Sequence, residues 1–249
     1  NYAFANMKAV IDVYLPKTLK SIGDYAFRDS TVLPTIDLPK NLEEIGQSAF
    51  RGCTALTEIT LPAKMTEIAN DTFRDCTALE EVTFNNLINE IGDNAFNGCV
   101  RLSSIRLPKK LESIGARAFS GCSALKTLAL PDGINAIGDE AFNGCNSLED
   151  LKLPVNITRI GTRTFADCQT FTSATIPICV TYIGDGAFSG CTGLQSITVK
   201  TERPQNLQLG EDVFAGVDKN QTVLNFPQGQ REYFTSAEQW KDFTNVNEQ

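Results

Sequence analysis

The 249-residue sequence contains no histidine, a single tryptophan and only two methionines. Without histidine, Ser-His-Asp triads, histidine general bases and histidine metal ligands are all excluded. Aspartate, glutamate, lysine, tyrosine and cysteine remain as possible catalytic groups, so the absence lowers the expectation of an enzyme without abolishing it. No apolar run approaches the roughly 18 residues of a transmembrane helix, and no signal peptide is visible at Asn1.

Positive charge is also in short supply, because 22 lysines and arginines face 30 aspartates and glutamates, for a net charge of -8. Nucleic acids and anionic membranes select basic surfaces, so we expect neither as a partner. The glycines are dispersed and form no phosphate-binding loop. Adjacent carboxylates such as Glu80 and Glu81 would point to opposite faces of a strand. The sequence therefore predicts no catalytic residue, no metal site and no cofactor.

Phenylalanine gives the clearest sign of internal repetition. It recurs every 23 residues without an insertion, at Phe4, Phe27, Phe50, Phe73, Phe96, Phe119, Phe142, Phe165 and Phe188. Alanine or threonine precedes each of these phenylalanines, and an Ile-Gly pair such as Ile45-Gly46 stands shortly before most of them. Such self-similarity is the signature of a solenoid, in which each unit stacks on the next.

Cysteine occupies a second column of the repeat, three residues after the phenylalanine. Its members are Cys53, Cys76, Cys99, Cys122, Cys145, Cys168 and Cys191. A large apolar residue, an Ile-x-Leu segment and usually a proline follow. Written out, the unit reads F-x-G-C-x-x-L-x-x-I-x-L-P-x-x-L-x-x-I-G-x-x-A.

A unit of this length cannot bury its apolar side chains alone, so stacked units must share one core. In Ile59-Thr60-Leu61 the side chains are predicted to point inward, outward and inward, as in a short strand with one buried face. The segment L-x-x-I-G predicts a second extended stretch on the opposite wall. Parallel copies lie about 4.8 Å apart, so about ten coils form a body roughly 50 Å long. Gly52 and Asp75, before the cysteine, suit turns with positive φ.

The unit resembles the leucine-rich repeat of the bacterial surface-antigen type, the BspA-like family, over roughly residues 1–200. The ending "LNFPQGQREYFTSAEQWKDFTNV" is similar to that of surface repeat proteins of gut Bacteroides-type bacteria. The resemblance implies an α/β repeat solenoid, a leucine-rich-repeat right-handed superhelix with a parallel sheet on one face and short strands, turns or helical turns on the other. Three positions depart from the pattern: Asn85 and Lys200 replace the proline, and Phe214 follows Phe188 after 26 residues.

The chain is expected to form one domain, with a solenoid of nine to ten repeats over residues 1–218 and a cap over 219–249. The first repeat is truncated, because "NYAF" aligns with "DYAF" at residues 24–27. This start predicts either a longer parent protein or an export signal that has been removed. Residues 201–213 hold the insertion and are predicted to form a loop. The cap would shield the last apolar rung from water and from edge pairing.

The seven cysteines of the column allow two interpretations. A metal or redox site needs ligands that converge on one point, whereas a column places them about 5 Å apart along a line. Neighbouring rungs are close enough for disulfides, but seven residues cannot pair completely. We therefore favour a ladder of buried, reduced thiols beside the phenylalanine ladder. Cys179 lies outside the column, and either a reactive thiol or an incidental surface residue fits its position.

The residues predicted to point outward along the strands form the candidate binding face. Its members are Asp37, Glu58, Thr60, Glu81, Thr83, Arg106, Lys126, Asp150, Lys152, Thr175 and Thr198. Solenoids usually bind through such a repeated face. A solvated sheet enriched in β-favouring threonine explains the same pattern, and the face has almost none of the aromatic residues that dominate binding hot spots.

Three hypotheses for function follow. The resemblance implies a non-enzymatic, surface-displayed or secreted adhesion module, a monomer that recognises a host or bacterial protein or a glycan. The alternative is a stiff spacer or assembly segment of a larger cell-surface protein, which the truncated start and the unremarkable strand face favour. An enzyme is the third and weakest possibility, because no site motif accompanies the missing histidines.

Overall fold

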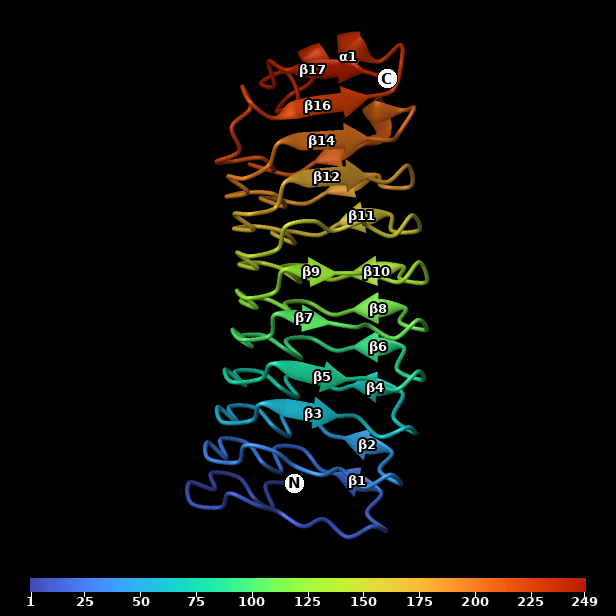
Figure 1. Cartoon of the computed structure of the whole chain (residues 1–249). Coiled ribbons are helices and arrows are strands. Elements are labelled where there is room, and N and C mark those ends of the chain that lie inside the picture. The colour runs from blue at the N-terminus through green and yellow to red at the C-terminus, as the bar shows by residue number, and fades with distance from the viewer.

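The computed structural model describes residues 1–249 and shows a solenoid of about ten coils stacked along one axis. The N- and C-terminal ends of the chain lie at opposite ends of the stack (Figure 1). The predicted repeat solenoid with parallel strands is therefore confirmed. Helices are nearly absent: the structure has one short α-helix, α1 (Arg231–Ser236), and one 3-10 turn, η1 (Pro204–Asn206). Short strands and tight turns make up the walls, so the helical turns that were among the expected elements are not found there.

The first wall, which we call the strand face, is built from the Ile-x-Leu segment of each repeat. Its strands are β3 (Glu58–Thr60), β5 (Glu81–Thr83), β7 (Ser104–Ile105), β9 (Thr127–Leu128), β12 (Ser173–Ile176), β14 (Ser196–Val199), β16 (Val223–Phe226) and β17 (Val246–Glu248). All recorded pairings between them are parallel. Ile59 and Leu61 are buried on either side of exposed Thr60, which confirms the predicted alternation.

The second wall comes from the segment that ends in Ile-Gly, as predicted. Its strands are β1 (Ser21–Ile22), β2 (Glu44–Ile45), β4 (Glu67–Ile68), β6 (Glu90–Ile91), β8 (Ser113–Ile114), β10 (Ala136–Ile137), β11 (Arg159–Ile160), β13 (Tyr182–Ile183) and β15 (Gln208–Leu209). These strands also pair in parallel, each with the equivalent residue of a neighbouring coil. In Figure 1, β4, β6, β8 and β10 form one edge of the stack beside the strand face.

A third wall of turns carries the phenylalanine and cysteine columns, and we call it the turn wall. Its backbone N–H groups alternate between two kinds of partner. Ala26 N donates to Gly23 O within its own coil, and Phe27 N donates to Ala49 O of the next coil at 2.7 Å. This alternation requires positive φ before the cysteine, as predicted at Gly52 and Asp75. It also requires positive φ two residues before each phenylalanine, at positions held by residues as large as Arg117.

The glycine of each Ile-Gly pair is explained by the coil that precedes it. Ala116 N donates to Asp93 Oδ1 at 2.7 Å, so an aspartate side chain ties two coils together at this corner. A Cβ on Gly115 would lie 2.6 Å from Asp93 N. Where Ala116 takes the place of the aspartate, a Cβ on Gly138 would still lie too close to Ala116 N, and only one repeat has alanine in the glycine's place, at Ala69. Close approach of the backbones, more than φ, therefore selects glycine here.

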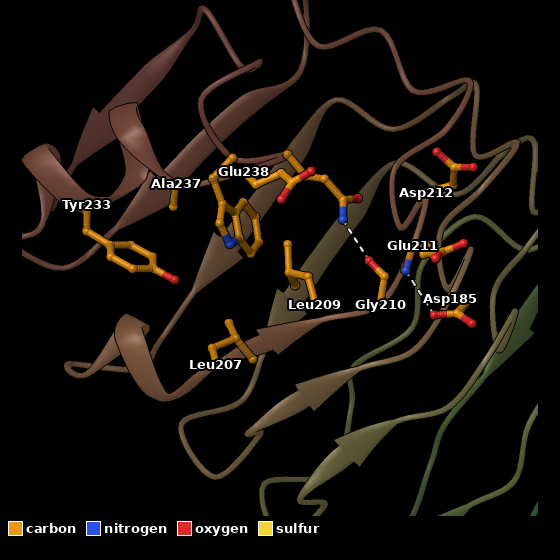
Figure 2. Close-up of a pocket in the computed structure, with 11 residues that line it drawn as sticks. Asp185, Leu207, Leu209, Gly210, Glu211, Asp212, Tyr233, Ala237 and Glu238 are labelled. Carbon is orange, nitrogen blue, oxygen red and sulfur yellow. Dashed lines mark hydrogen bonds between the residues drawn. The ribbon is translucent and has the colours of Figure 1, made fainter.

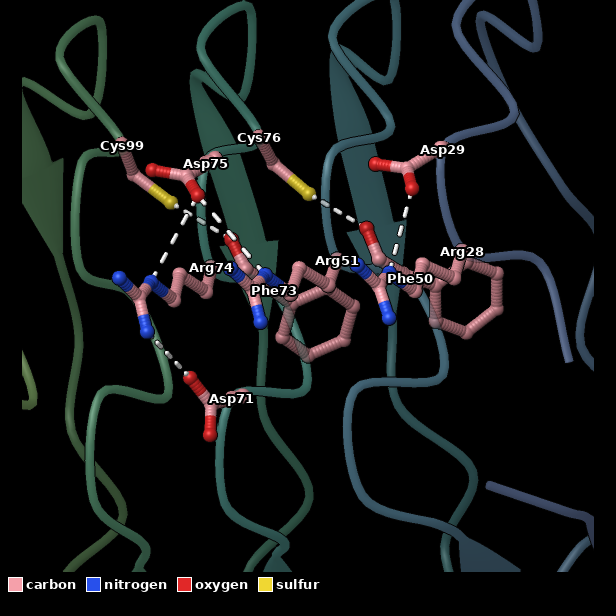
Figure 3. A network of polar contacts seen from close by, with 10 residues as sticks. All are labelled: Arg28, Asp29, Phe50, Arg51, Asp71, Phe73, Arg74, Asp75, Cys76 and Cys99. Carbon is pink, nitrogen blue, oxygen red and sulfur yellow. Dashed lines mark hydrogen bonds and ion pairs between the residues drawn. The ribbon is translucent and has the colours of Figure 1, made fainter. Parts of the chain in front are cut away.

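The core is a continuous apolar column with two ladders running through it. The phenylalanine rings stack nearly parallel, with centroids 5.4 Å apart for Phe96 and Phe119 and 5.7 Å apart for Phe119 and Phe142. Figure 3 shows the neighbouring ladder, in which Cys76 and Cys99 each reach the carbonyl oxygen of a phenylalanine in the preceding coil. The ladder phenylalanines and cysteines from Phe50 to Cys191 are all buried, and the cysteines are free thiols.

The C-terminal residues close the column. Trp240 and Phe243 pack on Phe214, with ring centroids 5.0 and 5.3 Å away. Residues 201–213 contain η1 and β15, and β15 continues the second wall by pairing with β13. In Figure 1, α1 and β17 lie at the end of the stack. Because of this packing, we propose that residues 1–218 form the solenoid and residues 219–249 form its cap.

Candidate binding surface

The structure places the eleven residues of the candidate binding face along the strand face. Ten of them are exposed, and Thr198 is half-buried. They point outward because their neighbours in the strand, such as Ile59 beside Glu58 and Thr60, are buried in the core. Seven coil steps separate Asp37 from Thr198, which is about 34 Å at about 4.8 Å per step. The eleven residues therefore form a long strip, not one compact site, and the strip divides into three sectors.

The first part of the strip is an acidic sector made of Asp37, Glu58 and Glu81, with Thr60 and Thr83 between them. Glu58 lies directly beside Glu81 in the β3–β5 pair, and Thr60 lies beside Thr83. Like charges in register repel each other, so this arrangement does not stabilise the sheet. Tyr14, which is 91% exposed, precedes the sector, and a hydrogen bond and the charge of Asp12 raise the pKa of its phenol.

The middle of the strip is a cationic sector made of Arg106, Lys126 and Lys152. All three side chains are exposed, and the structure records no ion pair for any of them. Two acidic residues lie among them: Asp150, which accepts a hydrogen bond from Ser173 Oγ at 3.3 Å, and Glu149, which lies beside Lys126 on the next coil. In contrast, nearby Arg101 pairs with Glu80. The three cations therefore form no ion pair, although the exposed carboxylates of Glu149 and Asp150 lie on the same part of the strip.

The last part of the strip is a neutral sector that contains Thr175 and Thr198. These residues lie side by side in the β12–β14 pair, and Thr198 in turn lies beside Asn225 of β16. Asn225 Oδ1 accepts hydrogen bonds from Asn247 Nδ2 at 3.0 Å and from Gln249 Nε2 at 2.8 Å. The strict 23-residue period does not reach Asn225, so the repeat pattern did not identify this residue, and its side chain is buried in the structure.

Many charges on the other walls are paired within the protein. Arg117 makes two hydrogen bonds to the carboxylate of Glu140, at 3.0 and 2.6 Å, and this contact lowers the pKa of Glu140. Lys20 and Lys64 both contact Glu43 and lower its pKa. The turn wall of the early coils carries a row of arginine-aspartate pairs, including Arg74 with Asp71 at 3.1 Å (Figure 3). Such exposed ion pairs contribute little to the stability of the fold, but each charge in them already has a partner within the protein.

The cysteine column offers no ligand set for a metal ion. No group of three or more cysteine, aspartate or glutamate side chains lies close enough to hold one. Burial raises the pKa of the Cys53, Cys122 and Cys191 thiols to about 12. The thiolate that redox chemistry and metal binding require is therefore disfavoured in this column. Cys179 is exposed and stands apart from it.

Comparisons with known proteins agree with this architecture. The family profile described as "BspA type leucine rich repeat region (6 copies)" matches residues 1–126 and 112–232. A crystal structure of a leucine-rich repeat protein from T. pallidum is 28% identical with a TM-score of 0.63, over 70% of this chain and 82% of that one. A leucine-rich repeat protein from Eubacterium ventriosum is 21% identical with a TM-score of 0.61, over 87% and 67% of the two chains.

A third solved structure, a leucine-rich repeat protein from Bacteroides ovatus, is 24% identical with a TM-score of 0.51. The match covers 100% of this chain and 80% of that one. The last two likenesses concern the fold alone. No curated protein sequence matches at a significant level. No helix in the structure has the length and apolar character needed to cross a membrane.

Proposed function

Because the chain belongs to the BspA-type leucine-rich repeat family, we propose that it is a non-enzymatic recognition module that binds a partner through its strand face. Leucine-rich and other solenoid repeats present long, regular surfaces that suit extended partners. We further propose that the module acts as a monomer, secreted or displayed at the surface of a bacterial cell. The partner is a protein or a glycan, either of the host or of another bacterium.

The cationic sector is the observation that carries this proposal. Arg106, Lys126 and Lys152 are exposed, lie on neighbouring coils and take part in no ion pair within the protein. Two further unpaired cations, Lys109 and Lys110, follow Arg106 at the turn after the strand. Exposed cations that are free of ion pairs attract complementary anionic surfaces and help to fix their orientation. The sector therefore fits an anionic partner, such as a sialylated or sulfated mucin glycan or an acidic patch on a matrix protein.

The rigidity of the scaffold supports the same proposal. The sector rests on buried residues of one uninterrupted core, including Ile105, Leu128 and Leu151. A surface on a rigid element loses little conformational entropy when a partner binds. The same rigidity also favours the alternative function, a stiff spacer within a larger surface protein. The continuous stack of phenylalanine rings from Phe4 to Phe214 is the observation in favour of the spacer.

Binding of the purified chain to an array of immobilised matrix proteins, mucins and glycans tests the proposal. The array is probed at 150 mM salt with the native protein, with Arg106→Glu/Lys152→Glu and with a control, Lys17→Glu/Lys40→Glu. Lys17 and Lys40 are exposed lysines without ion pairs at the turns of earlier coils, so the control makes the same change in net charge. We expect saturable binding to one anionic class, weakened at least tenfold in the first variant and unchanged in the control.

Three results would count against the recognition module. Equal losses in both variants would show attraction to net charge alone, which salt screens. Binding that survives in both variants would place the contact on another surface. Absence of saturable binding across the array would favour the spacer, since a spacer needs no ligand for its strand face.

A further inference from the structure

The molecule has an open cleft of about 760 Å³ between the last coil and the cap. Its floor contains half-buried Leu209 beside the buried residues Leu207 and Trp240, and its rim is polar. Figure 2 shows Tyr233 and Ala237 of the cap facing Leu207 and Leu209 across the opening. The cleft is separate from the strand face, because none of its lining residues belongs to a strand of that face. Its volume is within the range typical of ligand pockets.

One side of the cleft is an unpaired strand edge. In β15, Gln208 N donates to Thr181 O at 2.9 Å, and Gly210 N donates to Ile183 O at 2.7 Å, so these groups point back to the previous coil. The alternate groups, Leu209 N–H and the carbonyls of Leu207 and Leu209, point the other way. In the previous coil, the equivalent groups of Thr181 and Ile183 form hydrogen bonds to β15. In the last coil these groups have no such partner, because no further coil follows and no cap residue donates to them or accepts from them.

The cap covers the two sheets differently. On the strand face, β17 adds in parallel to β16 and pairs from Leu224 to Phe226. On the second wall the cap supplies only the side chain of Gln239, whose Nε2 donates to Gly210 O at 2.7 Å and whose Oε1 accepts from Val213 N at 2.8 Å. This glutamine holds the end of β15 and leaves the outward backbone groups of Leu207 and Leu209 unpaired, whereas the Leu207 side chain is buried and the Leu209 side chain half-buried. An open edge of this kind is a template for a further strand.

Charge around the cleft indicates what that strand would carry. Four acidic residues line it, Asp185, Glu211, Asp212 and Glu238, and no lysine or arginine does. All four are exposed, and none takes part in an ion pair. A lysine side chain could lay its aliphatic stem on the leucines and keep its ammonium group among the carboxylates. The rim therefore selects a basic occupant.

The floor of the cleft contains one further unsatisfied group. The indole N–H of Trp240 is buried and has no acceptor in the protein. A buried donor without a partner costs about 1–3 kcal/mol, so this position favours an incoming oxygen. A peptide carbonyl oxygen could accept the hydrogen bond that the Trp240 N–H does not make within the protein.

We propose that this cleft binds an extended, lysine-containing peptide segment of a partner protein, which adds to β15 as the next parallel strand. Backbone hydrogen bonds to Leu207 and Leu209 hold the segment, the apolar floor accepts alternate aliphatic side chains, and the acidic rim accepts the lysines. This mode of recognition derives affinity from the main chain and specificity from alternate side chains. It is independent of the anionic partner proposed for the strand face.

A fluorescein-labelled, acetylated heptapeptide of alternating valine and lysine is the probe, titrated into the full chain at 150 mM salt. Anisotropy reports binding, and the emission of Trp240, the sole tryptophan, reports occupancy of the cleft. We expect saturable binding with a shift in Trp240 emission and slower hydrogen exchange at the Leu209 amide. A peptide of alternating valine and glutamate should bind at least tenfold more weakly.

Two peptides with N-methyl groups on alternate residues separate strand addition from simple charge attraction. One carries them on the odd residues and the other on the even residues, so each blocks one edge of an extended strand. We expect one to lose at least tenfold in affinity and the other to stay within about threefold. Equal behaviour of the two peptides, or no saturable binding, would overturn the proposal.

Protein variants test the rim. Glu211→Lys/Glu238→Lys should weaken binding at least tenfold, whereas Glu202→Lys/Glu232→Lys makes the same change in charge at exposed positions outside the cleft and should not. Equal losses in both variants would overturn the role of the rim. Arg106→Glu/Lys152→Glu should keep the peptide affinity within about threefold, so failure here and failure on the strand face are distinguishable.

Discussion

The thiol of Cys145 donates a hydrogen bond to the carbonyl oxygen of Phe119, 3.2 Å away in the preceding coil. The same bond joins each of the other cysteines of the column to the phenylalanine 26 residues earlier. Ser30 makes it too, from its hydroxyl to Phe4 O at 2.8 Å, in the repeat without a cysteine. The column is therefore a ladder of weak donors that satisfies buried carbonyls of the turn wall.

Cys145→Ser should retain more stability than Cys145→Ala. Serine keeps a donor for Phe119 O, as Ser30 does for Phe4, whereas alanine removes the donor and leaves a small void. We expect the alanine variant to lose about 1–2 kcal/mol more of the free energy of unfolding than the serine variant. Urea denaturation followed by circular dichroism measures the difference. An alanine variant at least as stable as the serine variant would contradict the role of the bond.

Phe119→Ala should reduce the free energy of unfolding by about 3–5 kcal/mol, because Phe119 is fully buried between two stacked rings. Phe4→Ala is the matched control at the end of the same ladder. Phe4 is 41% exposed and stacks on Phe27 alone, so its loss should cost much less. The same denaturation experiment compares them, and similar losses at the two positions would show that the ladder is not a packed core.

Gly115→Ala should be destabilising by about 1–3 kcal/mol, as expected for overpacking. The new Cβ would lie 2.6 Å from Asp93 N, which cannot move without disturbing the neighbouring coil. Ala69→Gly is the reverse change at the equivalent place of another coil and should cost only about 0.5–1 kcal/mol through chain entropy. Thermal unfolding ranks the two. A Gly115→Ala protein as stable as the native one would exclude close approach as the reason for the glycine.

Stability should fall in mildly alkaline solution. Burial raises the pKa of the Cys53, Cys122 and Cys191 thiols to about 12, whereas an unfolded thiol ionises near 8.5. Between these values the unfolded state binds fewer protons than the folded state. The contribution is therefore fully present below about pH 8.5 and is lost as the pH rises toward 12, by about 1.4 kcal/mol per pH unit for each thiol.

Urea denaturation at a series of pH values from 7.5 to 10 measures this slope. Cys122→Ala/Cys145→Ala removes two buried thiols and should show a shallower decline than the native protein. Cys179→Ala removes the exposed cysteine and serves as the control, with an unchanged slope. A native protein whose stability is flat over this range would contradict burial of the column as protonated thiols.

The solenoid could be predicted from the sequence because its physical cause is local and repeated. A side chain that must be buried in every coil, such as Phe119, recurs in every repeat and shows itself in one sequence. The Ile-x-Leu and Ile-Gly segments gave both strand walls for the same reason. The positive φ at Arg117 was not visible, since the conformation is imposed by hydrogen bonds to the next coil and leaves no glycine in the sequence.

The candidate site was less accessible to prediction. Outward positions such as Arg106 and Lys152 follow from strand alternation, so their exposure could be read from the pattern. The sequence pattern could not show which charged residues form ion pairs, because Arg101 reaches Glu80 of another coil while Arg106 pairs with no carboxylate. The cleft beside β15 was also invisible, since it arises where the cap leaves Leu207 and Leu209 unpaired at the point where the repeat period breaks.

A partner bound to the cationic sector of the strand face would shield the backbone of that sector from solvent. Hydrogen exchange followed by mass spectrometry, with and without the array ligand that binds with the highest affinity, measures this shielding. We expect slower exchange confined to the outward segments around Arg106, Lys126 and Lys152, with little change on the second wall or the turn wall. Protection elsewhere on the chain, or no array ligand that gives protection, would contradict binding at this sector.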